Sequence, residues 1–369
     1  MMKTTSVHSN SGGMALIMAM IAIFVMSALV AGFALSMKVE ARLAHNADSE
    51  QQLLWLGRSG MELARYVLSQ QLTIPNEPYD SLNQKWAGGS GSLAESNTVL
   101  SSISLDNYPV GDGTVSIKII DLERKVNINT AINPANSQMI QQALTLMGVD
   151  ASDISVVSDS IKDWIDSDDL PLAAGAESDY YQGLPVPYYA KNAPIDDMSE
   201  LLLIKGIMDQ PEIYWGGSAT NHTRAQFQHK LGFGTAPGQI PDYPFGLTNI
   251  FTPFSSGKIN LLTTTDANVL QMIPGVDNVI AENIIKLRAG PDGVDGTEDD
   301  TPFQDPGAAL QNAGLDPQLA SRAAAYCTLR SFTFEVHVTA QIGDYKREYV
   351  AILARNSGTD IQVVSFYWK

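Results

Sequence analysis

Carboxylate side chains crowd into two short segments, and they are the residues of this sequence best suited to chemistry. In the first segment, residues 163–179, a helix is expected to end near Pro171 and Gly175. Carboxylates this close repel one another unless a cation lies among them or water screens them. A ligand set made only of oxygens suits Ca²⁺, which takes six to eight oxygens in a flexible geometry. The predicted ligands are Asp166, Asp168, Asp169, Glu177 and Asp179.

The second segment, residues 290–302, intersperses carboxylates with glycines that let the backbone fold around an ion. It lacks the spacing and the closing Glu of an EF-hand loop, but it resembles calcium-binding loops of secreted proteins. The alternative for both segments is an acidic loop that is solvated and binds no ion. The predicted ligands in the second segment are Asp292, Asp295, Glu298, Asp299 and Asp300.

Signals for catalysis are weak. Paired carboxylates can serve a glycosidase, but no nucleophile elbow, P-loop, His-rich metal motif or Rossmann glycine pattern is present. The single cysteine, Cys327, rules out an intrachain disulfide and a zinc site with several Cys ligands. The formal charge of −17, from 23 Lys and Arg against 40 Asp and Glu, opposes binding to a phosphate backbone. We therefore expect neither an enzyme nor a nucleic-acid-binding protein.

The elements that must position these clusters begin with an uncharged run from Met14 to Met37. As a helix this run would reach about 36 Å, enough to cross the hydrocarbon core of a membrane. An ordinary signal anchor is one interpretation. A cleaved secretory signal is another, although its apolar region is usually shorter.

Apolar residues continue beyond the uncharged run at helical spacing. Steps of three and four residues place them on one face of a helix, and Pro75 should stop that helix. One helix is therefore predicted from about Met14 to Gln70, with its first half in lipid and its second half packed on a soluble domain. Part of the apolar stripe is also expected to contact helices of partner subunits. The stripe consists of Leu53, Leu56, Gly60, Leu63 and Val67.

Alternating polar and apolar residues predict strands near both ends of the soluble part. We expect a small antiparallel sheet against the amino-terminal helix, in a pilin-like α+β domain made of residues 38–125 and 331–369. Residues 75–113 are rich in Asn, Ser, Gly and Pro, which predicts a long connecting loop. The predicted strands are residues 114–120, 331–339, 348–353 and 361–367.

Residues 126–330 carry mostly helical signals and are predicted to form a large helical insert in that domain. An internal repeat supports this prediction, because segment 125–131 is echoed by segment 258–264 and each copy precedes an apolar helical stretch. The second copy continues through a Pro-Gly turn into another helix, which is the pattern of a helix-hairpin-helix. DNA-binding hairpins usually have a second glycine where this chain has Asp277, so we expect packing rather than DNA binding. A third, weaker hairpin is expected around residues 201–206.

The leader, residues 1–13, is short and polar and ends in Gly13, directly before the apolar run. This arrangement resembles the prepilin leader of type IV pilins and type II secretion pseudopilins. The resemblance implies that a membrane-embedded prepilin peptidase cuts between Gly13 and Met14. Most members of that family have Glu at the fifth position of the mature chain, where this chain has Met18.

Further motifs resemble the protein K family of minor pseudopilins from type II secretion systems. They lie at Tyr180 and, in the family's order, in segments 121–130, 163–169, 175–177, 187–188, 191–192 and 200–206. The resemblance implies a pilin-like domain with a large helical insert, and calcium on that insert. It also implies a single-pass anchor in the inner membrane, with the bulk of the chain in the periplasm.

The same resemblance implies a place at the tip of the pseudopilus, in complex with minor pseudopilins I and J. Met18 in place of the family's acid and the bulky insert both fit a subunit above which nothing stacks. The alternative function is that of a type IV pilus minor pilin, or of a membrane-anchored adhesion module with the same leader and anchor.

Overall fold

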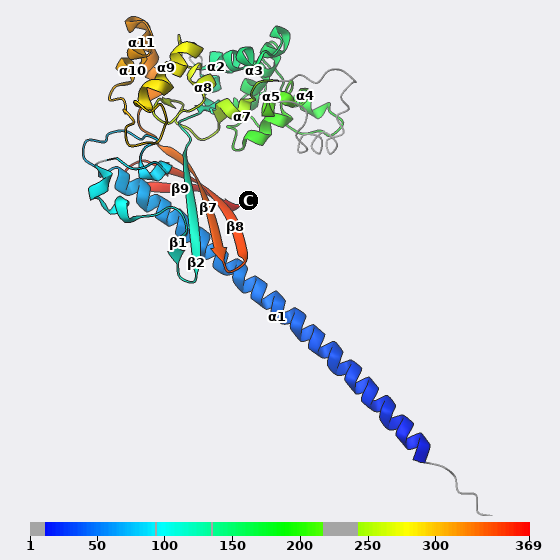
Figure 1. Cartoon of the computed structure of the whole chain (residues 1–369). Coiled ribbons are helices and arrows are strands. Elements are labelled where there is room, and N and C mark those ends of the chain that lie inside the picture. The colour runs from blue at the N-terminus through cyan, green and yellow to red at the C-terminus, as the bar shows by residue number, and fades with distance from the viewer. Residues whose placement is uncertain (1–11, 93, 134–135, 217–242) are drawn as a thin grey trace, which may run out of the picture.

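One long helix, a sheet along its second half and a helical insert make up this chain (Figure 1). The structure is a computed structural model, and it describes residues 12–92, 94–133, 136–216 and 243–369. The insert covers the end of the sheet that lies farthest from the amino terminus (Figure 1). Of the predicted leader, only Gly12 and Gly13 are described, and they form the start of the first helix.

Helix α1 (Gly12–Gln71) has 60 residues and matches the predicted helix to within two residues at each end. Every side chain from Met14 to Asp48 is exposed. Within the described ranges, α1 is the one helix long and apolar enough to cross a membrane. Its apolar half therefore projects from the domain as a bare rod (Figure 1).

The sheet has five antiparallel strands in the order β1-β2-β7-β8-β9, and the four predicted strands are among them. Alternation of side chains places one face of β2 and β7 on α1, where Ile117 pairs with Val338 across the two strands. A turn at Gly343 joins β7 to β8, and Gly343 has a φ of 54° there. The strands are β1 (Tyr108–Val110), β2 (Gly113–Asp121), β7 (Thr333–Ile342), β8 (Tyr345–Arg355) and β9 (Ile361–Trp368).

The second half of α1 packs its apolar stripe on this sheet, as predicted. Leu53, Leu56 and Val67 are buried, with exposed fractions of 3%, 7% and 1%, while Leu63 is half-buried. Gly60 allows a close approach, because a Cβ on it would lie 2.4 Å from Cγ1 of Val338. The expectation that partner subunits contact the same stripe is wrong, because the chain's own sheet covers it.

The segment predicted to be a long connecting loop is more ordered than that. It contains three short 3-10 helices and strand β1, and it is fastened by buried apolar side chains. Trp86 is 1% exposed and meets Phe334 edge-on, with ring centroids 5.3 Å apart. The composition of this segment did not reveal Trp86 as an anchor, because isolated apolar side chains among many small polar ones make no periodic pattern. The helices are η1 (Lys85–Ala87), η2 (Glu95–Asn97) and η3 (Val99–Ser102).

The insert runs between β2 and β7 and has its own apolar core. Helices make up most of its regular structure, as predicted. Its helices are η4 (Ile128–Ile132), α2 (Ser137–Met147), α3 (Ala151–Ile165), α4 (Ser178–Gln182), η5 (Met198–Leu203), α5 (Glu212–Trp215), α7 (Leu247–Ile250), α8 (Ala267–Leu270), α9 (Asn278–Arg288), α10 (Pro306–Asn312), α11 (Pro317–Ala323) and η6 (Ala324–Tyr326).

Each copy of the sequence repeat opens with a two-residue strand that the sequence analysis did not predict. In the first copy β3 (Val126–Asn127) pairs in parallel with β4 (Phe251–Thr252). In the second copy β5 (Ile259–Asn260) pairs in parallel with β6 (Cys327–Thr328). Strands this short cannot show a period of two, so alternation could not reveal them.

The predicted hairpin of the second copy is a turn between α8 and α9. Gly275 has a φ of 84° in this turn, and Asp277 is the N-cap of α9, because its carboxylate accepts the backbone N–H of Ile280 at 2.9 Å. In the third predicted hairpin, Asp197 and Glu200 form a capping box on η5. The cap on α9 accounts for Asp277 at the position where DNA-binding hairpins have a second glycine. The helix-hairpin-helix classification itself stays a prediction.

Candidate metal centre

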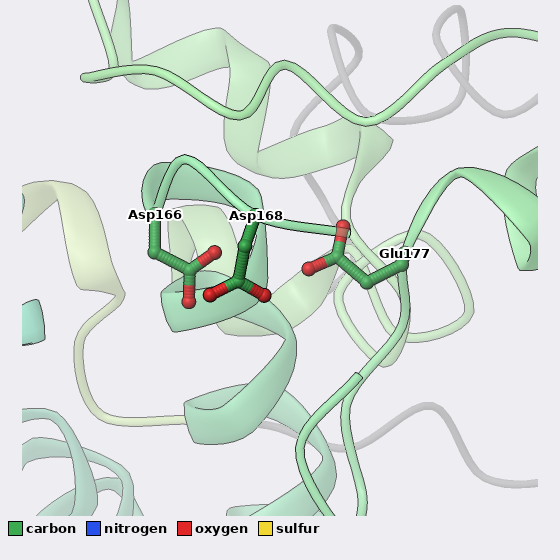
Figure 2. Close-up of side chains that lie close together, drawn as sticks. All are labelled: Asp166, Asp168 and Glu177. Atoms are coloured by element: carbon green, nitrogen blue, oxygen red, sulfur yellow. The ribbon is translucent and has the colours of Figure 1, made fainter. Parts of the chain in front are cut away.

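The first acidic cluster lies where helix α3 ends inside the insert. The inner face of α3 is anchored by buried Ile161 and Trp164, so the last turn of the helix is held in the core. The chain leaves α3 at Asp166 and returns at Glu177, which directly precedes α4. The carboxylates of Asp166 and Glu177 point toward Asp168 from either side (Figure 2).

Three of the five predicted ligands of this cluster converge. Asp166, Asp168 and Glu177 each offer one carboxylate oxygen, and these oxygens lie within 4.8 Å of one another. Calcium–oxygen bonds of about 2.3–2.6 Å place ligand oxygens on opposite sides of the ion roughly 5 Å apart. A calcium ion therefore fits the space among these three carboxylates, and it is the one such group of three among the residues that the structure describes.

Besides the convergence of the three carboxylates, the surroundings of Glu177 independently favour a bound cation. Its side chain is 3% exposed, yet neither carboxylate oxygen accepts a hydrogen bond from the described residues. Burial, together with repulsion from Asp163 and Asp166, raises the pKa of Glu177 to about 7. A buried carboxylate without a partner is costly, and a divalent cation would remove that cost. One oxygen of Asp166 is unpaired in the same way.

Asp163 lies under the cluster and was not among the predicted ligands. It is fully buried, and its two oxygens accept the backbone N–H of Leu172 at 3.2 and 3.1 Å. Burial raises the pKa of this carboxyl to about 6, with a smaller contribution from Asp166. Gly175 is required beside it, because a Cβ there would lie 1.8 Å from Oδ2 of Asp163. Asp163 therefore shapes the turn that carries Glu177.

The other two predicted ligands lie outside the converging group. Asp169 accepts the backbone N–H of Ser178 at 3.4 Å, and Asp179 is exposed on α4. Sequence reasoning missed Asn192, whose amide donates to the carbonyl of Asp168 at 2.8 Å and whose own carbonyl oxygen is buried and unpaired. Its place in a motif of the resembled family was its only signal, since no ligand spacing links it to Asp168.

The second predicted calcium loop uses its carboxylates differently. Asp295 forms a two-pronged ion pair with Arg288, with N–O distances of 2.9 and 2.7 Å. Asp299 accepts the Thr297 hydroxyl and the backbone N–H of Asp292, and these hydrogen bonds hold the pKa of Asp299 below its usual value. Backbone N–H groups also satisfy Asp292, through Val294, and Asp300, through Gly296.

The carboxylates of this second loop are thus held by the protein itself. Glu298 is exposed. The loop also touches the pilin-like domain, where the N–H of Ser90 donates to the carbonyl of Gly296 at 3.2 Å. Calcium in this loop stays a prediction, and it has less geometric support than the centre at Glu177.

Comparisons with known proteins agree with this architecture. The family profile "Type II secretion system (T2SS), protein K" matches residues 119–214, which contain the metal centre. Type II secretion system protein K of Pectobacterium carotovorum is 33% identical over 27% of this chain and 34% of its own length. The Aeromonas hydrophila protein is 26% identical over 54% of this chain and 60% of its own length.

Over residues 119–214 the chain is similar to the type II secretion system protein K family. The Klebsiella pneumoniae member is 26% identical over 53% of this chain and 58% of its own length. The chain therefore spans between about a third and three fifths of the lengths of these protein K relatives.

The fold is also similar to that of a solved structure. A chain in the crystal structure of the GspK-GspI-GspJ complex from enterotoxigenic Escherichia coli superposes with a TM-score of 0.61. That match has 18% sequence identity and covers 88% of this chain and 99% of the other. The pilin-like helix and sheet with a large insert are thus a fold that this chain shares with a solved structure.

Proposed function

We propose that this chain is the minor pseudopilin at the tip of a type II secretion pseudopilus, a structural component of protein export across the outer membrane. The observation that carries the proposal is the form of the molecule: a pilin-like helix and sheet that ends in a broad insert (Figure 1). The insert is far wider than the helix, so another subunit could not stack over it without a clash. The solved relative was crystallised with GspI and GspJ, which supports two smaller minor pseudopilins as partners.

The same proposal places the chain in the inner membrane and the periplasm. The exposed apolar half of α1 would be the single membrane anchor, and the sheet and insert would lie in the periplasm. A prepilin peptidase would cut between Gly13 and Met14, where the chain changes from polar to apolar. The role proposed is one of assembly, with no catalytic step and no nucleic-acid ligand.

Calcium belongs to this proposal as a structural ion. Asp166, Asp168 and Glu177 would hold it by oxygen atoms, and its charge would offset the repulsion within the cluster. The ion would fix the turn between α3 and α4 on the insert. Calcium is favoured over Mg²⁺, which demands near-ideal octahedral geometry and dehydrates reluctantly.

Co-purification tests the proposed place in the pseudopilus. The full-length chain would be expressed with the minor pseudopilins I and J of its own secretion system and extracted from membranes in detergent. We expect a complex containing one copy of each chain, and intact mass should show that this chain starts at Met14. Crosslinks from the insert should reach no major pseudopilin above it.

Two outcomes would contradict the proposal. Crosslinks spread along the whole filament would rule out a tip subunit. Failure to bind I and J, combined with binding to type IV pilus subunits, would favour the minor pilin or adhesion module. A mature chain that starts at Met1, or after Met37, would remove the prepilin interpretation.

A further inference from the structure

The insert joins the pilin-like domain at a compact polar junction. The chain enters the insert after Asp121, the last residue of β2, and returns to the sheet at Thr333, the first residue of β7. Asp121 and Glu123 lie at this crossing and are almost completely buried, with exposed fractions of 2% and 0%. Neither takes part in the metal centre.

Asp121 links the sheet to the insert through hydrogen bonds from both. Its Oδ2 accepts the hydroxyl of Ser331 at 2.5 Å, just before β7. The same oxygen accepts the hydroxyl of Thr263 and the amide of Asn260, both from the insert. Its Oδ1 accepts the backbone N–H of Glu123 at 2.8 Å. One carboxyl group therefore accepts hydrogen bonds from the segment after β2, from the segment before β7 and from the insert.

Glu123 repeats this arrangement with backbone donors. Its Oε2 accepts the N–H groups of Phe332 and Thr333, each at 3.0 Å. Its Oε1 accepts the N–H of Ser256, from the insert, at 3.1 Å. The carboxyl groups of Asp121 and Glu123 are also within hydrogen-bond contact of each other.

The charges around this pair are already engaged elsewhere. Arg355, on β8, forms a fully buried ion pair with Asp80, which follows α1, and also donates to the carbonyl of Ser331 at 2.7 Å. Lys125 donates to the carbonyl of Thr248 at 2.6 Å. No cation among the described residues is hydrogen-bonded to either carboxyl of the pair. Around Lys125 the charged side chains are Arg124, Asp266 and Glu335.

Two interacting carboxyl groups in a buried site resist being ionised together at neutral pH. Burial raises the pKa of Asp121, and burial together with the charge of Asp121 raises the pKa of Glu123 to about 8. A single proton placed between the two groups would remove the repulsion and add a hydrogen bond. The surrounding donors can then remain in place.

We propose that Asp121 and Glu123 form a latch that closes by sharing one proton and fastens the insert to the pilin-like domain. In an open junction both groups would be in water and would ionise as ordinary carboxylic acids. Opening therefore releases the proton, and the latch is tighter at acidic pH than at alkaline pH. The inference does not depend on the partners proposed above.

The sign and size of the effect follow from linkage. The pKa of Glu123 is about 8 in the closed junction against an ordinary value of 4.5. Between these two values, each rise of one pH unit should weaken closure by up to about tenfold, because one proton is released on opening. Below this window closure is strongest, and above it the weakening stops.

Hydrogen exchange of the junction amides tests the latch in the full chain, held in detergent with excess Ca²⁺ so that the metal centre does not titrate. The amides to follow are those of Ser256, Phe332 and Thr333, which donate to Glu123. After correction for intrinsic exchange, their protection should fall up to about a hundredfold from pH 5.5 to 7.5. In Asp121→Asn the repulsion from Asp121 is gone and only burial still raises the pKa of Glu123, so the fall should be clearly smaller than in the wild type.

The control is Asp344→Asn, an exposed acid in the β7–β8 turn, which should retain the wild-type pH dependence. Protection that does not change with pH in the wild type, or that changes equally in Asp121→Asn, would overturn the latch. If Asp121→Asn does not fold, infrared spectroscopy of the wild type decides the question. The C=O band of a protonated carboxylic acid should be present at pH 7 with Ca²⁺ bound and should titrate near pH 8. Absence of that band at pH 7 would overturn the proposal.

Discussion

Asp168 and Glu177 come together because the turn after α3 brings the chain back beside the end of that helix. We predict that Ca²⁺ raises the melting temperature of the folded insert, and that a chelator lowers it. At a hundredfold excess of Ca²⁺ over its dissociation constant the stabilisation is about 2.7 kcal/mol. Asp168→Asn should remove most of this response, since it removes a charged ligand. Differential scanning calorimetry with EGTA, Ca²⁺ and Mg²⁺ measures it.

Asp179→Asn is the matched control for that experiment. Asp179 belongs to the same acidic segment, but it is exposed and outside the converging group, so its response to Ca²⁺ should equal that of the wild type. A melting temperature that is indifferent to Ca²⁺ and to chelator would show that the cluster is a solvated acidic loop.

Gly175 allows a separate prediction at the level of one atom. Gly175→Ala would put a Cβ 1.8 Å from Oδ2 of Asp163, so the turn or the carboxylate must move. We expect a loss of about 1–3 kcal/mol in the free energy of unfolding, the usual cost of overpacking. Chemical denaturation measures it, and Gly183→Ala, where the nearest contact is 3.3 Å, is the milder comparison. Equal stability of the two variants would contradict this account of the turn.

At this scale the sequence predicted where acids crowd together, but not how each carboxylate is held. Acid crowding pointed to a cation, and three of the five acids in the first segment do converge. In the second segment Asp295 is paired with Arg288 instead. The spacing of the acids does not distinguish the two segments. The difference arises from the guanidinium of Arg288 and from backbone N–H donors, which only the tertiary fold brings to the second segment.

At the level of elements, the two halves of helix α1 have different surroundings. Gly32 in its first half faces open space, while Gly57 and Gly60 in its second half are pressed on the sheet. Gly60→Ala would place a Cβ 2.4 Å from Val338, so we expect the free energy of unfolding to fall by about 1–3 kcal/mol. The usual gain of up to about 1 kcal/mol from Ala in a helix should not compensate.

Gly32→Ala is the control, because no atom lies within 4 Å of its Cβ position. Thermal unfolding of the full chain in detergent should show no loss for this variant. If Gly60→Ala proved as stable as the wild type, the helix and sheet would have to be less tightly packed than these contacts require.

Elements with a long period could be predicted, and those without one could not. The strand from Gly113 to Asp121 alternates over nine residues, so its period of two is plain. The ladders β3–β4 and β5–β6 are two residues long, and 3-10 turns such as η1 have no distinctive period. These elements are fixed by tertiary contacts, for example those of Trp86, and not by local pattern.

The whole molecule combines a narrow rod with a broad head (Figure 1). Hydrophobic spacing and an N-terminal run without charge sufficed to predict this plan, because each half of α1 has its own pattern. They did not predict which side of the rod remains free. The sheet takes the side of Leu56, and the neighbouring flank of the helix presents Trp55, which is 57% exposed.

Trp55 borders a groove of about 260 Å³ between α1 and the β1–β2 turn, whose lining includes Val110, Asp112 and Ile342. The guanidinium of Arg58 lies 5.3 Å from the centre of its ring. An exposed Trp beside an Arg at a groove is typical of residues that dominate binding energy at protein interfaces. The free side of the soluble half of α1 is therefore the surface that we expect partner pseudopilins to contact, in place of the buried stripe.

Two neighbouring substitutions separate binding from folding. Trp55→Asp should weaken the complex with minor pseudopilins I and J by at least about thirtyfold, equivalent to 2 kcal/mol or more, while leaving the melting temperature of the free chain almost unchanged. Leu56→Asp should instead unfold the pilin-like domain, because it buries an unpaired carboxylate under the sheet. Size-exclusion chromatography of the co-expressed chains, with thermal unfolding of each variant, gives both readouts. A Trp55→Asp chain that binds its partners as the wild type does would place the interface on another surface, with the edge strand β9 as the next to test.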